Sequence, residues 1–318
     1  MNIDETKPQI SVIIPLYNKA PYIGKAIDSI LTQTFQNFEI VIIGGKSSDG
    51  SEEIVQKYSD PRIRLIEETG VGVSAARNQG VNAAKSGTIA FLDADDEWMS
   101  NHLDTILKLK YEFPNAGVYA TGYKIVEGDS ETPCVYPTKK ESRLLKSYFS
   151  ERVDAGIRNQ FIMTSAAAVD KHIFQKIGGF NTSLAYAEDI DIYERMSVVT
   201  KIAYSPEVSV KYNYDIPDNT RTHVVFRKPL TSERMDTLWN SIQNTDDDEL
   251  KKDFLRYRDM NYATGGFVNA LRGHRKESIV LLKKVRSVKY IHLIAGAMIL
   301  NIFPRKIQVK LMQWHYRL

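Results

Sequence analysis

The sequence contains one cysteine, Cys134, among 318 residues. A single thiol can form neither an intrachain disulfide nor a cysteine-based zinc site, so we expect a reducing compartment. The first nine residues are polar and lack the apolar core of a signal peptide. The most apolar stretch, residues 290–303, has 14 residues, fewer than the roughly 20 that a spanning helix needs. These absences predict a cytoplasmic protein.

A strong net charge is also absent, but the charge is unevenly distributed. The formal net charge is +3, yet residues 251–318 carry 15 Lys and Arg against three Asp and Glu, and the remainder carries 27 against 36. A basic segment on an acidic body indicates an anionic partner, such as the cytoplasmic face of a membrane. A solvated helical face explains the same pattern. Nucleic acid is not expected, because no recognisable nucleic-acid-binding motif is present.

The first third of the chain alternates between two patterns. Short β-branched, apolar runs are typical of buried parallel strands, and stretches with apolar residues at helical spacing separate them. This alternation predicts an α/β fold with a doubly wound parallel sheet. The predicted strands are 10–15, 38–43, 63–66, 88–93, 116–126, 161–169, 201–204 and 208–214, and the predicted helices are 22–31, 51–58, 72–84, 101–113 and 171–177.

Acidic residues follow the fourth predicted strand. Residues 88–98 begin as an apolar run and then present four acids within five residues, starting at Asp93. Parallel α/β sheets bind ligands at this end of their strands, and a strand that continues this far places Asp93 and Asp95 on the same side. Adjacent carboxylates repel unless a cation lies between them, and Mn²⁺ or Mg²⁺ holding a substrate's phosphates meets this need. Alternatively, Asp95 or Asp96 caps a helix that starts near residue 99.

Three ordered blocks of the sequence resemble the family 2 glycosyltransferases. They are residues 11–18 (SVIIPLYN), residues 74–96 (SAARNQG through FLDADD) and residues 178–189 (GGFN through AED). The resemblance extends over roughly residues 9–215. It implies a GT-A, Rossmann-like nucleotide-diphospho-sugar transferase fold with a metal-binding D-x-D motif. It further implies an inverting hexosyltransferase that moves a sugar from a nucleotide-diphospho-sugar donor to a glycan or lipid-linked acceptor, in polysaccharide or glycolipid biosynthesis.

The resemblance also assigns site residues. Asp95, with help from Asp93, corresponds to the metal ligands, and His223 is a further candidate for the metal. Asp189 corresponds to the catalytic base, with Glu188 beside it; a charged helix N-terminus is the structural alternative for this pair. The candidates for donor binding are Pro15, Tyr17, Asn18, Gly44, Asp49, Arg77, Asp93, Ala94 and Arg221.

The chain departs from the family pattern after the second predicted strand. The family usually has paired acids there, one of which accepts a hydrogen bond from the nucleotide base, whereas this chain has Gly44 and Gly45. Glycine lets backbone groups approach the base closely, and Asp49 is a candidate for part of the missing role. Asp49 equally fits the N-cap of the helix at 51–58. The identity of the nucleotide base in the donor therefore stays open.

Arg77 has two interpretations, which are compatible. It lies on a helix that follows a glycine-rich turn, where its guanidinium can approach the donor diphosphate with help from the positive helix N-terminus. It can also hold the fold through an ion pair with Glu67, Glu68 or Asp93.

The chain is helical in pattern from residue 231 onward. We therefore expect a catalytic domain at 1–228 and a basic helical extension at 229–318. The apolar segment 290–303, flanked by basic and aromatic residues, either lies on an anionic membrane surface near a lipid-linked acceptor or docks on protein, including another subunit. The other expected features are an acidic linker at 246–249 and helices at 257–271 and 276–285.

Two other functions fit parts of the pattern. Gly44 and Gly45 suggest a nucleotide-sugar-binding scaffold protein that has lost turnover, although the D-x-D motif and the Glu188-Asp189 pair are both present. A nucleotidyltransferase on a similar sheet fits the acids but not the block at residues 178–189.

Overall fold

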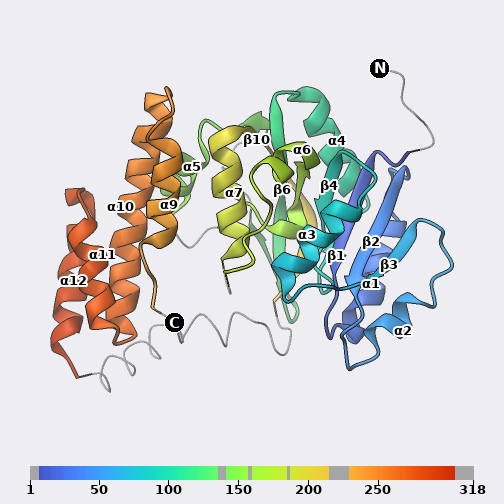
Figure 1. Cartoon of the computed structure of the whole chain (residues 1–318), viewed down its shortest axis with the longest axis horizontal. Helices are drawn as coiled ribbons and strands as arrows, with labels where there is room; N and C mark the ends of the chain where they lie inside the picture. The colour runs from blue at the N-terminus through green and yellow to red at the C-terminus, as the bar shows by residue number, and fades with distance from the viewer. Residues whose placement is uncertain (1–6, 135–140, 157–159, 185–186, 215–228, 305–318) are drawn as a thin grey trace. The chain divides into compact units, whose positions relative to one another are not determined.

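The computed structural model describes residues 7–134, 141–156, 160–184, 187–214 and 229–304. The chain divides into two compact units (Figure 1). One comprises Met1–Lys146 and Gln160–Pro217, and the other comprises Ser147–Asn159 and Asp218–Leu318. The sequence-based division assigned the segment at 147–159 to the catalytic domain, whereas it groups here with the C-terminal unit.

A single mixed sheet forms the centre of the first unit. In the described residues its strands follow the order β3-β2-β1-β4-β9-β6-β10-β5, with β7 beside β6 and β8 beside β10. The expected parallel pairing is found from β3 to β4 and between β6 and β10, but β9 is antiparallel to both β4 and β6. The strands are β1 (Ile10–Pro15), β2 (Phe38–Gly44), β3 (Ile63–Glu67), β4 (Thr88–Phe91), β5 (Glu97–Trp98), β6 (Ala116–Glu127), β7 (Ser130–Cys134), β8 (Arg143–Leu144), β9 (Ala167–Asp170) and β10 (Lys201–Asn213).

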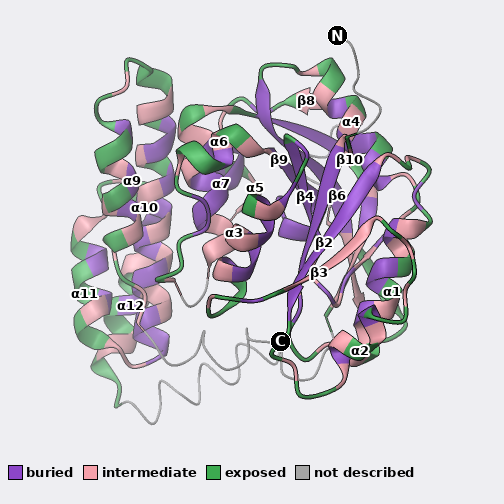
Figure 2. Ribbon diagram, turned by 45° about the vertical axis from the view of Figure 1, so that its right-hand side comes forward, coloured by how far each residue is buried: buried purple, intermediate pink, exposed green. Residues whose placement is uncertain are grey.

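Helices cover both faces of this sheet, whose strands are largely buried (Figure 2). Side chains alternate between the faces of a strand, so Val12 and Ile14 of β1 join the core that includes α1, while Ile13 faces α3. At the closest approach of α3, a Cβ on Gly80 would lie 2.3 Å from a methyl carbon of Ile13. Only glycine therefore lets α3 lie this close to β1. The helices are α1 (Ala20–Leu31), α2 (Ser51–Val55), α3 (Val73–Ala83), α4 (His102–Glu112), α6 (Lys171–Lys176) and α7 (Glu188–Val199).

Three local expectations for this unit are wrong. β4 ends at Phe91, so Asp93 and Asp95 lie in a turn, which the backbone bond from Asp96 N–H to the Asp93 carbonyl closes at 3.0 Å. The apolar run at 161–169 contains the short 3₁₀ helix η1 (Thr164–Ala166) before β9 begins. The two strands expected at 201–214 form one strand, β10, with register shifts where it passes β6.

The C-terminal unit is helical, as expected. Its centre is the long helix α10, against which α5, α11 and α12 pack. Gly265 and Gly266 let α10 approach the leucines of α11 closely, because a Cβ on Gly266 would lie 2.6 Å from Leu282. The helices are α5 (Tyr148–Ala155), α9 (Glu233–Ile242), α10 (Asp248–Leu271), α11 (Arg275–Lys284), η2 (Val288–Tyr290) and α12 (Ile291–Ile302).

The acidic stretch at 246–249 is a helix start rather than a linker. The Asp247 carboxylate accepts a hydrogen bond from the Leu250 N–H at 2.8 Å, and Asp248 and Glu249 occupy the first turn of α10. Acids in this position satisfy free N–H groups and interact favourably with the helix dipole.

One side of helix α12 is buried and the other side is exposed. Ala297 is fully buried in a small core with Ala270 and Leu282. On the opposite side the apolar residues Ile291, Met298, Ile299 and Ile302 are between 57% and 80% exposed. Within the described ranges, no helix combines the length and apolar character that crossing a membrane requires.

Burial of His102 generates a prediction on acid stability. The His102 ring is fully buried beside Trp98, its Nδ1 lies 2.8 Å from the Ser209 hydroxyl, and burial lowers its pKa to about 3. Folding therefore keeps the ring neutral, while the unfolded chain takes up a proton below about pH 6.5. Stability is lost as the pH falls through this window. Relative to a His102→Asn variant, the wild type should lose about 2 kcal/mol more unfolding free energy between pH 7 and 5.

Urea unfolding at the two pH values measures this difference. His172→Asn, which alters an exposed histidine on α6, is the matched control and should keep the wild-type pH dependence. Equal pH dependence in His102→Asn and the wild type contradicts the assignment.

Candidate active site

Two loops at the carboxyl edge of the sheet are joined by side-chain hydrogen bonds. Asn18, with a left-handed backbone φ of 50°, accepts a bond from the Ser48 N–H at 2.8 Å, and its own N–H donates to the Ser47 hydroxyl at 3.1 Å. The Asp49 carboxylate accepts bonds from the N–H groups of Ala20 and Ser51. Asn18 and Asp49 thus fix the β1–α1 loop against the β2–α2 loop. The N-cap residue of α2 is Gly50, not Asp49.

A carboxylate from α2 lies at the end of β2, where the sequence has glycines. Glu52 Oε1 accepts bonds from the N–H groups of Gly45, at 2.6 Å, and Ser47, at 3.2 Å. Burial raises the pKa of Glu52, but these hydrogen bonds outweigh it and lower the pKa overall. A Cβ on Gly44 would lie 3.2 Å from the same Oε1 atom. The region therefore contains an acid, supplied by a different element.

The acids after β4 each have a different partner. Asp93 Oδ1 lies 2.6 Å from Arg77 Nη2, and Asp95 Oδ2 lies 2.7 Å from the Lys19 ammonium. Asp96 is buried and accepts bonds from the Ser165 hydroxyl, at 2.6 Å, and from the backbone of β10. Asp96 therefore does not cap α4, whose N-cap residue is Asn101.

Burial and crowding raise the pKa of two of these carboxylates, Asp95 and Asp96. Burial raises the pKa of Asp95, and the neighbouring Asp93 raises it further, although Lys19 opposes the change. Burial, together with Asp95 and Asp93, raises the pKa of Asp96 well above its ordinary value. A cation near Asp93 and Asp95 relieves this repulsion.

The residues present fit a divalent metal held jointly with a substrate. Carboxylate oxygens suit Mn²⁺ and Mg²⁺, which usually take one or two carboxylates and complete their shell with water and substrate phosphates. Asp93 and Asp95 supply such a pair. Among the residues that the structure describes, no group of three or more His, Cys, Asp or Glu side chains forms a complete metal cage.

Arg77 connects two motifs that are far apart in the sequence. The side chain extends from α3, is 3% exposed, and lies 2.6 Å from Asp93 and 3.2 Å from Glu188. Burial lowers the pKa of Arg77, but the two carboxylates outweigh burial and raise it. The ion-pair interpretation is therefore observed, with Asp93 among the expected partners and Glu188 as a partner that the sequence did not indicate.

The next residue on α3 fixes the backbone of the third motif. The Asn78 side chain accepts a bond from the Phe180 N–H and donates one to the Phe180 carbonyl, both at 2.8 Å. A Cβ on Gly179 would lie 2.6 Å from Asn78 Oδ1, so glycine is required for this contact. Gly179 also has a positive φ of 69°, which glycine adopts readily.

Asp189 lies in the first turn of α7. Its Oδ2 accepts a bond from the Gln160 side chain at 2.6 Å, and its Oδ1 accepts one from the Ile190 N–H at 2.8 Å. Asp189 keeps part of its surface exposed, whereas Glu188 turns toward Arg77. Burial raises the pKa of Glu188, Arg77 lowers it, Asp189 and Asp93 raise it again, and the overall direction is upward.

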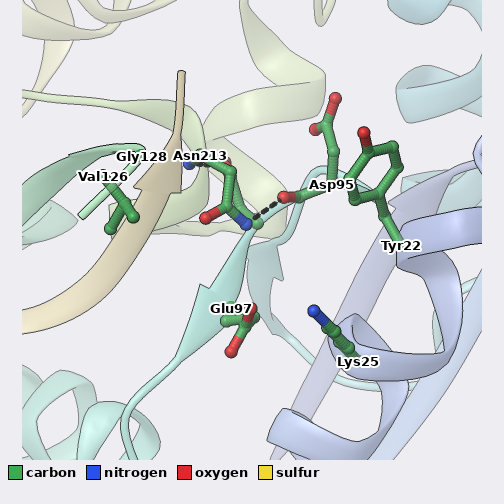
Figure 3. A pocket seen from close by; sticks show the side chains of 8 residues that line it. Tyr22, Lys25, Asp95, Glu97, Val126, Gly128 and Asn213 are labelled. Carbon is green, nitrogen blue, oxygen red and sulfur yellow. Dashed lines mark hydrogen bonds between the residues drawn. The ribbon is translucent and has the colours of Figure 1, made fainter. Parts of the chain in front are cut away.

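A small pocket borders the D-x-D turn (Figure 3). It has a volume of about 200 Å³ and is lined by Asp95 and Asp96 together with residues of α1, β5, β10 and the β6–β7 hairpin. Figure 3 shows the Asn213 amide turned toward the backbone oxygen of Asp95, to which it donates a bond of 2.6 Å. This bond fixes the position of the turn from the β10 side.

The other candidate residues fall into two groups. Pro15 is half-buried at the end of β1, Tyr17 is exposed in the loop that follows, and Ala94 is buried in the D-x-D turn. Arg221 and His223 lie outside the described residues, so the roles expected for them stay predictions.

Sequence analysis missed four side chains that contact the candidate site. Lys19 and Glu52 are charged residues near the ends of predicted strands, so their positions were a usable signal. Ser165 had only a weak signal, as a polar interruption in an apolar run, and Gln160 had none. These residues contact Asp95, Gly45, Asp96 and Asp189, respectively.

Comparison with known sequences identifies relatives of this chain. A family model described as Glycosyl transferase family 2 matches residues 11–178. The chain is 30% identical, over 243 residues, to an uncharacterized glycosyltransferase of Rickettsia prowazekii (strain Madrid E); the match covers 72% of this chain and 74% of that protein. It is 31% identical over 190 residues to the uncharacterized glycosyltransferase EpsJ of Bacillus subtilis (strain 168), covering 59% and 54% of the two chains.

Solved structures share the fold. TarS 1-349 of S. aureus, in complex with UDP-GlcNAc, matches with a TM-score of 0.68 at 17% identity, covering 96% of this chain and 92% of that one. The mannosyltransferase PcManGT of Pyrobaculum calidifontis, in complex with GDP-Man and Mn²⁺, matches with a TM-score of 0.59 at 19% identity, covering 97% and 86%. The expected GT-A fold with a helical C-terminal region is confirmed.

The buried Arg77 network generates a stability prediction. Replacing Arg77 by Ala leaves Asp93 and Glu188 without their shared cation in a site of low exposure. Loss of one partner from a buried ion pair typically costs about 3–5 kcal/mol, so we expect a loss of unfolding free energy of that order in chemical denaturation.

Arg62→Ala is the control for this experiment. Arg62 also forms a close ion pair, 2.7 Å from Asp60, but it is considerably more exposed, and such pairs contribute about 1 kcal/mol or less. Similar losses in the two variants contradict a special role for Arg77.

Proposed function

Because the chain belongs to the family 2 glycosyltransferases, we propose that it transfers a sugar from a nucleotide-diphospho-sugar to a hydroxyl of a glycan or lipid-linked acceptor, with inversion at the anomeric carbon. One observation carries the proposal: Arg77 contacts both Asp93 of the D-x-D turn and Glu188 at the start of α7. The acids expected for donor binding and for proton transfer therefore lie close together at one edge of the sheet.

The donor is a nucleotide sugar whose base is unassigned. UDP-GlcNAc and GDP-Man are bound by two structural neighbours, which differ in base. We propose that Glu52 takes the role of the missing acids after β2, because its carboxylate already contacts the backbone of Gly45. Arg77 is the proposed contact for the diphosphate, with the N-terminus of α3 contributing partial positive charge.

Asp93 and Asp95 are the proposed ligands of Mn²⁺ or Mg²⁺. A bound metal ion supplies positive charge that stabilises the leaving diphosphate. The Lys19 ammonium pairs with Asp95 Oδ2. Lys19 would have to move away before a metal could bind to that oxygen. Asp96 stays in place through Ser165 and holds the turn.

Asp189 is the proposed base. It accepts the proton of the acceptor hydroxyl as the hydroxyl oxygen forms a bond to the anomeric carbon and the bond from that carbon to the diphosphate oxygen breaks. Gln160 orients the carboxylate by its bond to Oδ2. Glu188 is the less suitable base, because Arg77 holds its side chain.

Calorimetric titration of UDP, GDP, CDP and dTDP, each with and without Mn²⁺, tests the proposal. We expect the wild type to bind one of them in a metal-dependent manner. Asp95→Asn should lose the metal-dependent part of the affinity. Asp189→Asn should retain nucleotide binding but lose sugar transfer or donor hydrolysis by about 10²–10⁴-fold, the usual contribution of a general base.

Each variant controls for the other, because both should fold while different steps fail. Full transfer activity in Asp189→Asn contradicts the assignment of the base. Metal-dependent binding that persists unchanged in Asp95→Asn contradicts the assignment of the metal ligand. Nucleotide-sugar binding without transfer or hydrolysis for any donor supports the alternative of a scaffold protein.

We also propose that the C-terminal unit lies on an anionic membrane surface, near a lipid-linked acceptor. Helix α12 contains no Asp, Glu, Lys or Arg, and its exposed side presents Ile299 and Ile302. Exposed apolar side chains next to cations are typical of helices that lie in a membrane interface. Arg286 and Lys289, both exposed, precede the helix.

Co-sedimentation with vesicles that contain phosphatidylglycerol tests this placement. Ile299→Glu/Ile302→Glu should reduce the bound fraction several-fold, because the substitutions place charge on the apolar side of α12. Tyr111→Glu/Val199→Glu alters two exposed apolar residues of the first unit, which are 72% and 49% exposed, and this variant should bind as the wild type does. Undiminished binding of the α12 variant counts against a membrane role for this helix.

A further inference from the structure

A pocket in the C-terminal unit has no part in the proposed transfer reaction. It has a volume of about 430 Å³ and lies between the first half of α10 and the segment that joins α11 to α12. The residues that α10 contributes recur three or four positions apart and so share one face of the helix. The volume is in the range of small-molecule sites.

Cations predominate on the lining of this pocket. Lys252 of α10 and Lys289 of the joining segment form no ion pair with any described residue. Lys251 lies 3.4 Å from Asp248, a carboxylate that is almost completely exposed. These ammonium groups are therefore available to an anionic ligand.

Arg256 adds a fourth cation that is only loosely held. Its guanidinium lies 3.7 Å from Asp154 and 3.7 Å from Asp253. Both distances exceed those of good hydrogen bonds. The fork of N–H donors on arginine matches the geometry of phosphate and carboxylate groups.

A buried acceptor also lines the pocket. Asp259 is 6% exposed, and its Oδ2 accepts bonds from the N–H groups of Arg286, at 3.1 Å, and Ser287, at 2.7 Å. Its other oxygen, Oδ1, has no hydrogen-bond partner among the described residues. An unpaired buried acceptor is costly, and a ligand that donates a hydrogen bond removes this cost.

Tyr290 brings a second polar group to the same place. Its ring is buried, and its hydroxyl has no partner in the described part of the chain. Burial raises the pKa of Tyr290, Arg256 lowers it and Asp259 raises it, because both charges lie near the phenol. The pocket thus combines cations, a buried carboxylate oxygen and a phenol.

We propose that this pocket binds a phosphate-bearing polyol. The phosphate lies among Lys252, Arg256 and Lys289, and a neighbouring hydroxyl donates to Asp259 Oδ1. A simple anion satisfies only the cations, whereas a phosphopolyol also satisfies the buried carboxylate. This inference goes beyond glycosyl transfer and does not depend on it.

Such a group occurs free, within a glycan and as a lipid head group. Val288 and Ile291 are exposed apolar residues on either side of Lys289 and Tyr290. A lipid-borne phosphopolyol would therefore find apolar side chains beside the pocket. The chemistry recognised by the pocket is the same in each case, and the experiment distinguishes the sources.

Calorimetric titration of sn-glycerol 3-phosphate and myo-inositol 1-phosphate into the full chain tests the site. Lys252→Ala/Lys289→Ala should weaken binding at least tenfold, which corresponds to about 1.4 kcal/mol. Lys276→Ala/Lys283→Ala removes two exposed lysines of α11 that do not line the pocket and should stay within about twofold of the wild type. Equal affinities in the wild type and both variants, or no binding at all in any arm, overturn the proposal.

Methyl phosphate, which has no hydroxyl, tests the role of Asp259. The wild type should prefer glycerol phosphate over methyl phosphate. Asp259→Asn keeps an oxygen for the N–H groups of Arg286 and Ser287 but replaces the free acceptor by a donor, so it should lose this preference while still binding methyl phosphate. The urea unfolding midpoint of this variant verifies that it folds. Equal affinity of the wild type for both phosphates overturns the polyol part of the proposal.

Phosphatidylcholine vesicles that contain equal fractions of phosphatidylinositol or phosphatidylserine, and so carry similar charge, identify the source. A gain on phosphatidylinositol over phosphatidylserine vesicles that disappears in Lys252→Ala/Lys289→Ala supports a lipid head group. Soluble phosphopolyol binding without this gain supports a free or glycan-borne ligand. Nucleotide titration of the same variants should match the wild type, so failure here is distinct from failure of the proposed transfer function.

Discussion

The contact of one guanidinium with two carboxylates holds the candidate active site together. Arg77 extends from α3 to Asp93 after β4 and to Glu188 at the start of α7, so three separate segments meet at one buried cation. The arginine is also stacked near the Phe180 ring, at 5.2 Å from its centroid. With Asn78 holding the backbone of Phe180, α3 fixes the D-x-D turn, the start of α7 and the segment at Phe180 relative to one another. Buried charges of this kind are tolerated only when every partner is present.

The three carboxylates after β4 can lie close together because each has a different partner. One is neutralised by Arg77, one lies on Lys19, and the third is buried with a raised pKa and hydrogen bonds from Ser165 and β10. The lysine that pairs with Asp95 is 22% exposed in its side chain, whereas the arginine that pairs with Asp93 is 4% exposed. Of the three acids, Asp95 therefore has the partner that is most easily exchanged.

The sequence was informative where a pattern repeats and less so where tertiary contacts decide. Apolar runs with β-branched residues located β1 and β2 within a residue or so, because burial on both faces leaves a continuous apolar signal. The same signal predicted a strand at residues 161–169, but the chain forms η1 there. The Ser165 hydroxyl accepts a bond from the Asp93 N–H and donates one to the Asp96 carboxylate. Asp93 and Asp95 were located as a pair, but their turn was not foreseen, since the end of β4 depends on its partner strands.

Partners across long sequence distances could not be inferred in the same way. Glu188 was identified as an acid near the base, but its contact with Arg77 joins residues 111 positions apart. Gln160 carries no pattern at all and is recognised only through its bond to Asp189. Glu52 was unassigned because the resemblance directed attention to positions 44 and 45, whereas the carboxylate reaches that place from α2.

The ion pair between Lys19 and Asp95 has a consequence for the proposed metal site. A divalent ion at the proposed site would compete with the ammonium group for the same oxygen. Its apparent affinity would then equal the intrinsic affinity multiplied by the fraction of molecules in which Lys19 has moved away. A nucleotide diphosphate that attracts Lys19 would increase that fraction. Metal and nucleotide would then bind with positive cooperativity, and each would appear weak when measured alone. Lys19 would thereby weaken metal binding at the proposed site until the donor is bound.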